Sequence, residues 1–149
     1  MKLQIRPLKQ TDREAWAELW RGYLEFYRTS RSEEIYDTLW ERLLGDHPYD
    51  GHCLIAELDG KPVGLTHYYF QRHGWSVEEV TYLQDLFAAP EVRGTGVGRA
   101  LIEGVYAAAD AAGRPAVYWL TEENNEVGRR LYDRIAVHTP FTRYQRALK

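Results

Sequence analysis

Residues 86–101 read LFAAPEVRGTGVGRAL, and this stretch decides the fold class. It begins in an apolar run, passes through glycines at alternate positions (Gly94, Gly96 and Gly98) and continues directly into a helical pattern. Alternating glycines let the backbone approach a ligand closely and adopt positive φ, and a helix N-terminus offers free N–H groups to an anion. The arrangement favours a phosphate or pyrophosphate ligand, with a glycine-rich turn that binds nothing as the plain alternative.

The two common phosphate-binding fingerprints fit this loop poorly. A P-loop requires Lys followed by Ser or Thr after its second glycine, and the loop has no such pair. The dinucleotide fingerprint requires Gly or Ala three residues after its second glycine, where this chain has Arg99 or Leu101. Glu122 follows the next predicted strand, roughly where a ribose-binding acid would stand, so the dinucleotide alternative is weakened but stays open.

Length and composition limit the remaining possibilities. The chain has 149 residues, of which 44% are hydrophobic and 28% charged, so we expect one globular domain over residues 1–149. A net charge of −3 argues against nucleic acid or a membrane surface as partner. No apolar run is long enough for a membrane helix, and no signal peptide is evident, so a cytoplasmic location is the default expectation. A single Cys and five His without metal-ligand spacing lead us to expect no metal.

Hydrophobic periodicity predicts the element order β-α-α-β-β-β-α-β-α-β. We expect helices at residues 11–28, 32–44, 98–112 and 125–135, and strands at 3–5, 52–57, 62–71, 80–88, 116–121 and 137–146. Asp59-Gly60 predicts a two-residue hairpin turn. This order indicates an α/β (α+β) fold with a mixed sheet and helices packed on it.

The loop resembles that of the GNAT family of N-acetyltransferases. Residues 93–98, RGTGVG, are similar to the Arg/Gln-x-x-Gly-x-Gly/Ala motif that holds the pyrophosphate of acetyl-CoA in that family. Asn125 and Tyr132, which follows Arg93 by 39 residues, resemble a cofactor contact and a proton donor of the family. Residues 82–87, YLQDLF, look like the YLEDLF/YLEDFF strand of the polyamine acetyltransferases and of a yeast subgroup that acetylates histones, polyamines and amino acids. The resemblance covers the whole chain and implies a central mixed, mostly antiparallel twisted sheet flanked by about four helices.

The resemblance also implies roles for individual residues. Tyr132 would protonate the leaving thiolate, and Asp85 would help to deprotonate the amine through a water, although both residue types also serve as packing or structural groups. Gln84 stands where the diamine enzymes carry Glu, which leaves the base and polyamine specificity open. The acceptor pocket would be lined by Tyr23, Glu25, Tyr27 and Gln84. The acetyl-CoA contacts would be Leu86, Phe87, Ala88, Arg93, Gly94, Thr95, Gly96, Val97, Gly98, Arg99 and Asn125.

The function expected from this resemblance is acetyl-CoA-dependent N-acetylation. The acetyl group would pass by direct attack in a ternary complex to a primary amine of a small molecule, either a polyamine or an amino-acid-like compound. A protein lysine or histone-type acceptor and a non-catalytic CoA-binding module are the alternatives. The resemblance and an aromatic C-terminal tail also predict a homodimer.

Overall fold

The computed structural model describes residues 2–148, so residues 1 and 149, the two ends of the expected single domain, lie outside the description. The chain divides into two compact units, one ending at Trp119 and the other beginning at Leu120, and each is described by itself. The first unit contains β1 (Leu3–Pro7), η1 (Gln10–Asp12), α1 (Arg13–Phe26), α2 (Glu33–Leu43), β2 (His52–Leu58), β3 (Lys61–Gln71), β4 (Val80–Ala88), η2 (Pro90–Val92), α3 (Val97–Ala111) and β5 (Val117–Tyr118). The second contains α4 (Glu126–Ile135).

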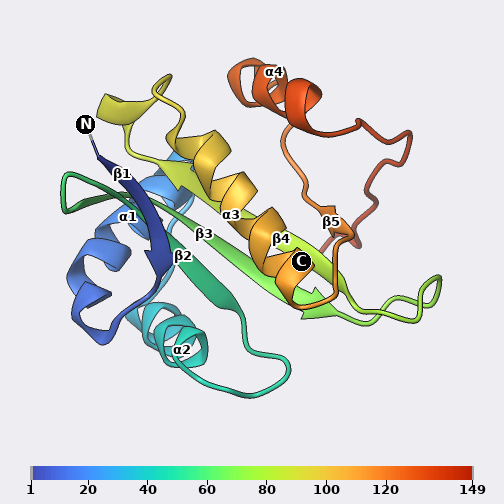
Figure 1. Ribbon diagram of the computed structural model, residues 1–149, viewed down its shortest axis with the longest axis horizontal. Helices are drawn as coiled ribbons and strands as arrows, with labels where there is room; N and C mark the ends of the chain where they lie inside the picture. The colour runs from blue at the N-terminus through green and yellow to red at the C-terminus, as the bar shows by residue number, and fades with distance from the viewer. Residues whose placement is uncertain (1, 149) are drawn as a thin grey trace. The chain divides into compact units, whose positions relative to one another are not determined.

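The sheet of the first unit has the strand order β1-β2-β3-β4-β5. Pairs from β1 to β4 are antiparallel, and β5 pairs in parallel with β4. Helix α3 lies along one face of the sheet, and α1, with α2 packed against it, covers the other (Figure 1). The predicted mixed, mostly antiparallel sheet is therefore confirmed.

Local signals in the sequence place several element ends correctly. Asp59 and Gly60 have φ angles of 52° and 83° and join β2 to β3 in the predicted two-residue turn. Ser32 caps α2, because its Oγ accepts a hydrogen bond from the backbone N–H of Ile35 at 3.4 Å. Gly113, at φ 72°, follows α3 as expected for a helix C-cap.

Aromatic side chains dominate the core between α1 and the sheet. Trp16 is fully buried and stacks on Trp20 with ring centroids 5.7 Å apart. Tyr36 of α2 meets Trp20 edge to face at 4.8 Å, and Trp40 packs on Trp16 at 5.3 Å. Pairs of this kind stabilise the fold beyond the burial of their area, so these four rings help to hold α2 against α1.

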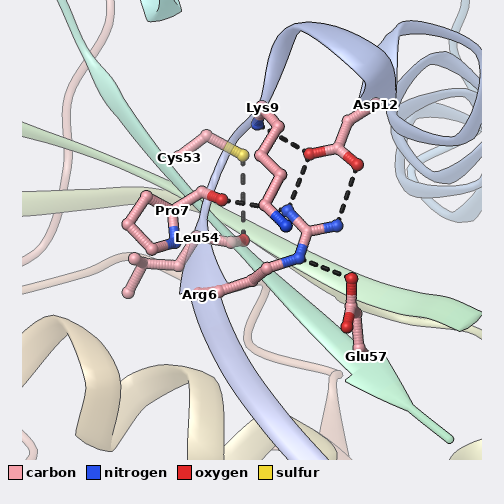
Figure 2. A network of polar contacts seen from close by, with 7 residues as sticks. All are labelled: Arg6, Pro7, Lys9, Asp12, Cys53, Leu54 and Glu57. Atoms are coloured by element: carbon pink, nitrogen blue, oxygen red, sulfur yellow. Dashed lines mark hydrogen bonds and ion pairs between the residues drawn. The ribbon is translucent and has the colours of Figure 1, made fainter. Parts of the chain in front are cut away.

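A buried ion network ties β1 to β2 and to the start of α1 (Figure 2). The Arg6 guanidinium donates two parallel hydrogen bonds to Asp12, both at 2.8 Å, and a third to Glu57. Asp12 also accepts from the backbone N–H of Lys9 at 2.7 Å. The hydrogen bonds from Arg6 are the main cause that lowers the pKa of Asp12, and they outweigh the opposing effect of burial.

Two predicted strands differ in the structure. Residues 116–121 form only the two-residue β5, which is an edge strand paired with β4 and has half-buried or exposed side chains. Residues 137–146 form no strand, although β structure was expected there. Pro140 lacks an N–H, and α4 is the one regular element of the second unit among the described residues, so this segment has no strand in its own unit to pair with.

The first helix also begins differently from the prediction. The helix expected from residue 11 starts at Arg13, because a 3₁₀ turn, η1, precedes it. The carboxylate of Asp12 at the end of this turn accepts a hydrogen bond from the backbone N–H of Lys9. Within residues 2–148, no helix has the length and apolar character that a membrane crossing requires.

Candidate active site

The glycine loop joins β4 to α3 and leaves the start of α3 uncovered. Gly94 and Gly96 have φ angles of 83° and 93°, in the left-handed region that other residues avoid. A Cβ built on either glycine would meet no atom within 4 Å, so the loop is open on that side. The first turn of α3 contains no acidic residue, and its first backbone N–H groups have no acceptor within the helix. These features fit a bound anion such as a pyrophosphate.

The strand that leads into this loop has an open edge. β3 pairs with one edge of β4 along its length, whereas β5 pairs with the other edge only at Thr81 and Tyr82. In the described part of the chain, no strand of the sheet therefore lies against this second edge of β4 beyond Tyr82. Leu86 and Ala88 of this segment are half-buried, whereas Phe87 is buried against Gly22 of α1. The backbone of residues 83–88 is therefore available on one side for an extended ligand.

Arg93 and Arg99, the cations of the predicted pyrophosphate site, have different surroundings. The Nε of Arg93 donates to the carbonyl of Ala88 at 3.1 Å, and its guanidinium lies over the rings of Phe26 and Phe87 at 5.5 and 5.4 Å. Arg99 is exposed and forms an ion pair with Glu103 one turn later, at 2.7 Å. Arg93 thus braces the junction between β4 and the loop.

Asp85 lies at the centre of a buried polar cluster. Its Oδ2 is 2.8 Å from Nδ1 of His67 on β3 and accepts from the indole N–H of Trp20 at 3.3 Å. His67 in turn accepts from the indole N–H of Trp16 at 3.0 Å. Asp85 is only 7% exposed, so its immediate environment consists of protein donors.

Tyr23 connects Asp85 to the predicted acceptor pocket. Burial, followed by the charge of Asp85 and a hydrogen bond to it, raises the pKa of the Tyr23 hydroxyl, so the phenol stays protonated and donates to the carboxylate. The ring of Tyr27 lies 5.1 Å from that of Tyr23. The structure therefore brings together Asp85, Tyr23 and Tyr27, three of the residues singled out in the sequence.

Gln84 occupies a β-bulge. In the register of β3 and β4, His67 is opposite Asp85 and Tyr68 is opposite Leu83, which leaves Gln84 as the extra residue. Gln84 is exposed, in contrast to its neighbour Asp85. Asp85 and Phe87 both face α1. The bulge explains this, because the extra residue Gln84 changes which face of the sheet the following side chains of β4 point to.

Glu25 belongs to a groove between α1 and the ends of β3 and β4. The groove has a volume of about 720 Å³ and is lined on one side by Glu18, Glu25 and Phe26. Phe87 and Arg93 line the other side. Glu25 is exposed on α1. The α1 residues that hydrogen-bond to Asp85 are Trp20 and Tyr23.

The second unit holds Asn125 and Tyr132. Asn125 caps α4: its Oδ1 accepts from the N–H of Gly128 at 3.2 Å, and its Nδ2 donates to Oγ1 of Thr121 at 2.9 Å. Tyr132 is half-buried on α4, and its carbonyl accepts from the N–H of Ala136 at the helix end. Asn125 therefore has a helix-capping role in addition to the cofactor contact that the resemblance implies.

Sequence reasoning missed the partners of Asp85. In the sequence, His67 is one of five His without metal-ligand spacing, and Trp16 and Trp20 fall within the helix expected at residues 11–28. Their indole N–H groups and the ring of His67 form the cluster because β3 and β4 pair as they do. In the described residues, no group of three or more His, Cys, Asp or Glu could hold a metal ion.

Comparisons with known proteins agree with this geometry. The acetyltransferase (GNAT) family model matches residues 14–136. The D-amino-acid N-acetyltransferase HPA3 of Saccharomyces cerevisiae is 35% identical over 146 residues, which cover 97% of this chain and 91% of the yeast protein. Thialysine N-epsilon-acetyltransferase of Mus musculus is 31% identical over 111 residues, 68% of this chain and 64% of the mouse protein.

Solved structures show the same fold. The aminoglycoside N-acetyltransferase AAC(6')-Iy, in complex with a bisubstrate analogue, superposes with a TM-score of 0.84 at 20% identity and covers 100% of both chains. A ribosomal-protein-alanine N-acetyltransferase from Brucella melitensis gives a TM-score of 0.81 at 22% identity, over 99% of this chain and 100% of that one. The GNAT fold expected from the resemblance is confirmed. By its family match and its yeast relative, the chain belongs to the acetyltransferase (GNAT) family and is an acetyltransferase that uses acetyl-CoA.

Proposed function

We propose that this enzyme transfers the acetyl group to the primary amine of a small molecule, an amino-acid-like compound or a polyamine, by direct attack in a ternary complex. The observation that carries the proposal is the open edge of β4, which leads from Asp85 into the glycine loop and the start of α3. A chain of amides can add to such an edge like a strand, and an anionic group can lie against the helix N–H groups. Acetyl-CoA has an amide-containing arm and a pyrophosphate in this order.

The residues of the loop and of β4 bind the acetyl donor in this proposal. The backbone of Leu86, Phe87 and Ala88 pairs with the acetyl and pantetheine part. The amides of residues 94–99, with Arg93 and Arg99, hold the pyrophosphate, and Asn125 adds a contact. A backbone N–H near Leu86 stabilises the oxyanion that develops on the thioester carbonyl. No metal has a part in this chemistry.

The acceptor side consists of Tyr23, Glu25, Tyr27 and Gln84, with Asp85 behind them. An ammonium group cannot attack a thioester, so one proton must leave the amine before transfer. Asp85, through Tyr23 or a water, supplies the negative charge toward which that proton moves. The yeast relative is a D-amino-acid acetyltransferase and the mouse relative a thialysine acetyltransferase, and both names support a small amine as acceptor.

We further propose that Tyr132 protonates the departing thiolate and that the whole chain works as one catalytic domain. The family match supports the latter, since it runs from residue 14 to residue 136 and so extends past Trp119. A homodimer, expected from the resemblance, remains part of the proposal.

The test is release of CoA thiol from acetyl-CoA with a panel of D-amino acids, thialysine and diamines. We expect amine-dependent release with at least one of them. Gly96→Val should abolish it together with acetyl-CoA binding, because valine is strained at φ 93° and adds bulk to the open side of the loop. Gly74→Val is the matched control, since a Cβ there also meets nothing within 4 Å and its φ is ordinary. Absence of release with every amine, or full activity of a folded Gly96→Val variant, would overturn the proposal.

A further inference from the structure

A chain of buried hydrogen bonds lies behind Asp85, and the chemistry above gives no role to its central member, His67. Both ring nitrogens of His67 have partners: Nδ1 is 2.8 Å from Oδ2 of Asp85, and Nε2 is 3.0 Å from Nε1 of Trp16. His67 is 1% exposed and Trp16 is 0% exposed, so water does not compete for these bonds. The ring is therefore held at both ends.

The bonding pattern fixes the tautomer of His67. An indole N–H can only donate, so Nε2 of His67 must accept from Trp16. The ring proton then lies on Nδ1 and is donated to Asp85, which as a carboxylate can only accept. A second proton on Nε2 would place two donors against each other, so Trp16 keeps His67 in the neutral Nδ1–H form.

This tautomer determines how the Asp85 carboxylate is held. His67 donates to Oδ2 from β3, Trp20 donates to the same oxygen from α1, and Tyr23 donates to the carboxylate from one turn further along α1. Of these donors, His67 and Trp20 are buried, whereas Tyr23 is partly exposed. The carboxylate is thus anchored from the protein interior and presented through Tyr23 towards the solvent side.

We propose that His67 is a positioning residue for acetyl transfer: fixed by Trp16 as the Nδ1–H tautomer, it orients Asp85 so that the Tyr23–Asp85 pair meets the acceptor amine. The inference rests on the proposed function, in which the amine lies on this side of the site. Loss of the His67 hydrogen bond lets the carboxylate rotate away from Tyr23. A misplacement of about 1 Å can reduce turnover by about 10²-fold.

The test uses two variants of similar size. His67→Asn carries an amide N–H at the position in the side chain that corresponds to Nδ1, so it can still donate to Asp85, whereas His67→Leu cannot donate. We expect His67→Leu to reduce kcat/KM for the best amine by about 10- to 100-fold while the Kd of acetyl-CoA stays within about twofold. His67→Asn should recover most of the loss. A residue with only a packing role would show no such rescue and no such separation of amine turnover from acetyl-CoA binding.

Trp16→Phe provides a second variant in case His67→Leu does not fold. It removes the indole N–H and keeps an aromatic ring, so the tautomer of His67 is no longer fixed. Trp40→Phe is the matched control, because its ring packs on Trp16 and takes no part in this chain of hydrogen bonds. We expect kcat/KM for the amine to fall in Trp16→Phe and to stay near wild type in Trp40→Phe.

Imidazole ¹⁵N NMR spectra read the tautomer directly and without any turnover. The wild type should show a protonated Nδ1 and an unprotonated Nε2 for His67, and Trp16→Phe should show a mixture. A proton on Nε2 in the wild type, or equal kcat/KM for wild type, His67→Asn and His67→Leu, would overturn the inference. A wild type that acetylates no amine would instead overturn the proposed function, and the positioning role would fall with it even where the spectrum shows the expected tautomer.

Discussion

Nδ1 of His67 and Oδ2 of Asp85 lie 2.8 Å apart across the neighbouring strands β3 and β4. The two residues are directly opposite in the strand register, and both are buried. Asp85 therefore receives its donors from the protein interior, and Tyr23 is its partly exposed neighbour. The pair indicates a carboxylate whose orientation is set before any substrate binds.

Asp85→Asn should lower acetylation of amines more than binding of acetyl-CoA. The amide has no negative charge to receive a proton, and its NH₂ group cannot accept from the surrounding donors. We expect kcat/KM for the best amine to fall by about 10²-fold or more and the Kd of acetyl-CoA to remain within about twofold. Calorimetry and steady-state kinetics measure the two quantities. Asp110→Asn, at an exposed position of α3, is the control. If Asp85→Asn weakens acetyl-CoA binding as much as it lowers kcat/KM for the amine, Asp85 only supports the fold.

Asp12→Asn should destabilise the protein in a pH-dependent way. The Arg6 hydrogen bonds lower the pKa of Asp12 in the folded state. The stability that the ionised Asp12 gives the folded protein is therefore fully present above the ordinary carboxyl pKa of about 3.9. Removing this partner from the buried Arg6 should cost about 3 kcal/mol in the free energy of unfolding near pH 7. The difference from wild type should shrink as the pH falls below about 4, because the wild-type carboxylate then becomes protonated too. Urea unfolding at several pH values gives these energies, and a difference that grows towards acid pH would contradict the assignment.

Much of the fold could be predicted because its signals are local. The strand at 80–88, the turn at Asp59-Gly60 and the start of the helix at residue 32 depend on residues close together in the chain, and all three are found. The strand predicted at 137–146 was wrong because a strand needs a partner, and alternating residues do not specify one.

The partner of Asp85 could not be predicted for a related reason. Counting back from the pair of Gln71 and Val80 without a bulge would place Gln84, not Asp85, opposite His67. The extra residue at Gln84 shifts the register by one position, and no residue pattern announced it. The glycine loop and Asp85 could therefore be predicted as site residues from the sequence. The hydrogen bonds by which His67 and Trp16 hold Asp85 could not.

Gln84→Glu should increase the preference for acceptors with two positive charges. Gln84 is exposed in the bulge beside Asp85, so a glutamate there adds a second carboxylate without burial. An exposed charge pair contributes about 0.2–1 kcal/mol, which corresponds to a gain of up to about fivefold in kcat/KM for a diamine relative to a monoamine. Competition between the two amines, followed by mass spectrometry, gives the ratio. An unchanged or reduced ratio would remove Gln84 from the acceptor site.

Tyr132→Phe should reduce kcat and leave the Kd of acetyl-CoA unchanged. The substitution keeps the ring and removes only the hydroxyl, so packing on α4 is retained. General acids contribute typically about 10²- to 10⁴-fold, and we expect a loss at the lower end because water can replace part of the effect. The measurements are kcat on the best amine and the Kd of acetyl-CoA, with a pre-steady-state burst experiment to detect rate-limiting product release. A kcat within about twofold of wild type, without a burst, would exclude Tyr132 as the proton donor.

The most direct test of the central claim, acetyl transfer to a small amine, compares acceptors in one assay. The wild-type enzyme and acetyl-CoA are incubated separately with a D-amino acid, thialysine, a diamine and a lysine-containing histone peptide, and kcat/KM is determined for each acetylated product by mass spectrometry. We predict that the best small amine exceeds the peptide by more than about tenfold, a difference of about 1.4 kcal/mol in transition-state binding. A peptide acetylated as well as or better than every small amine would contradict the claim.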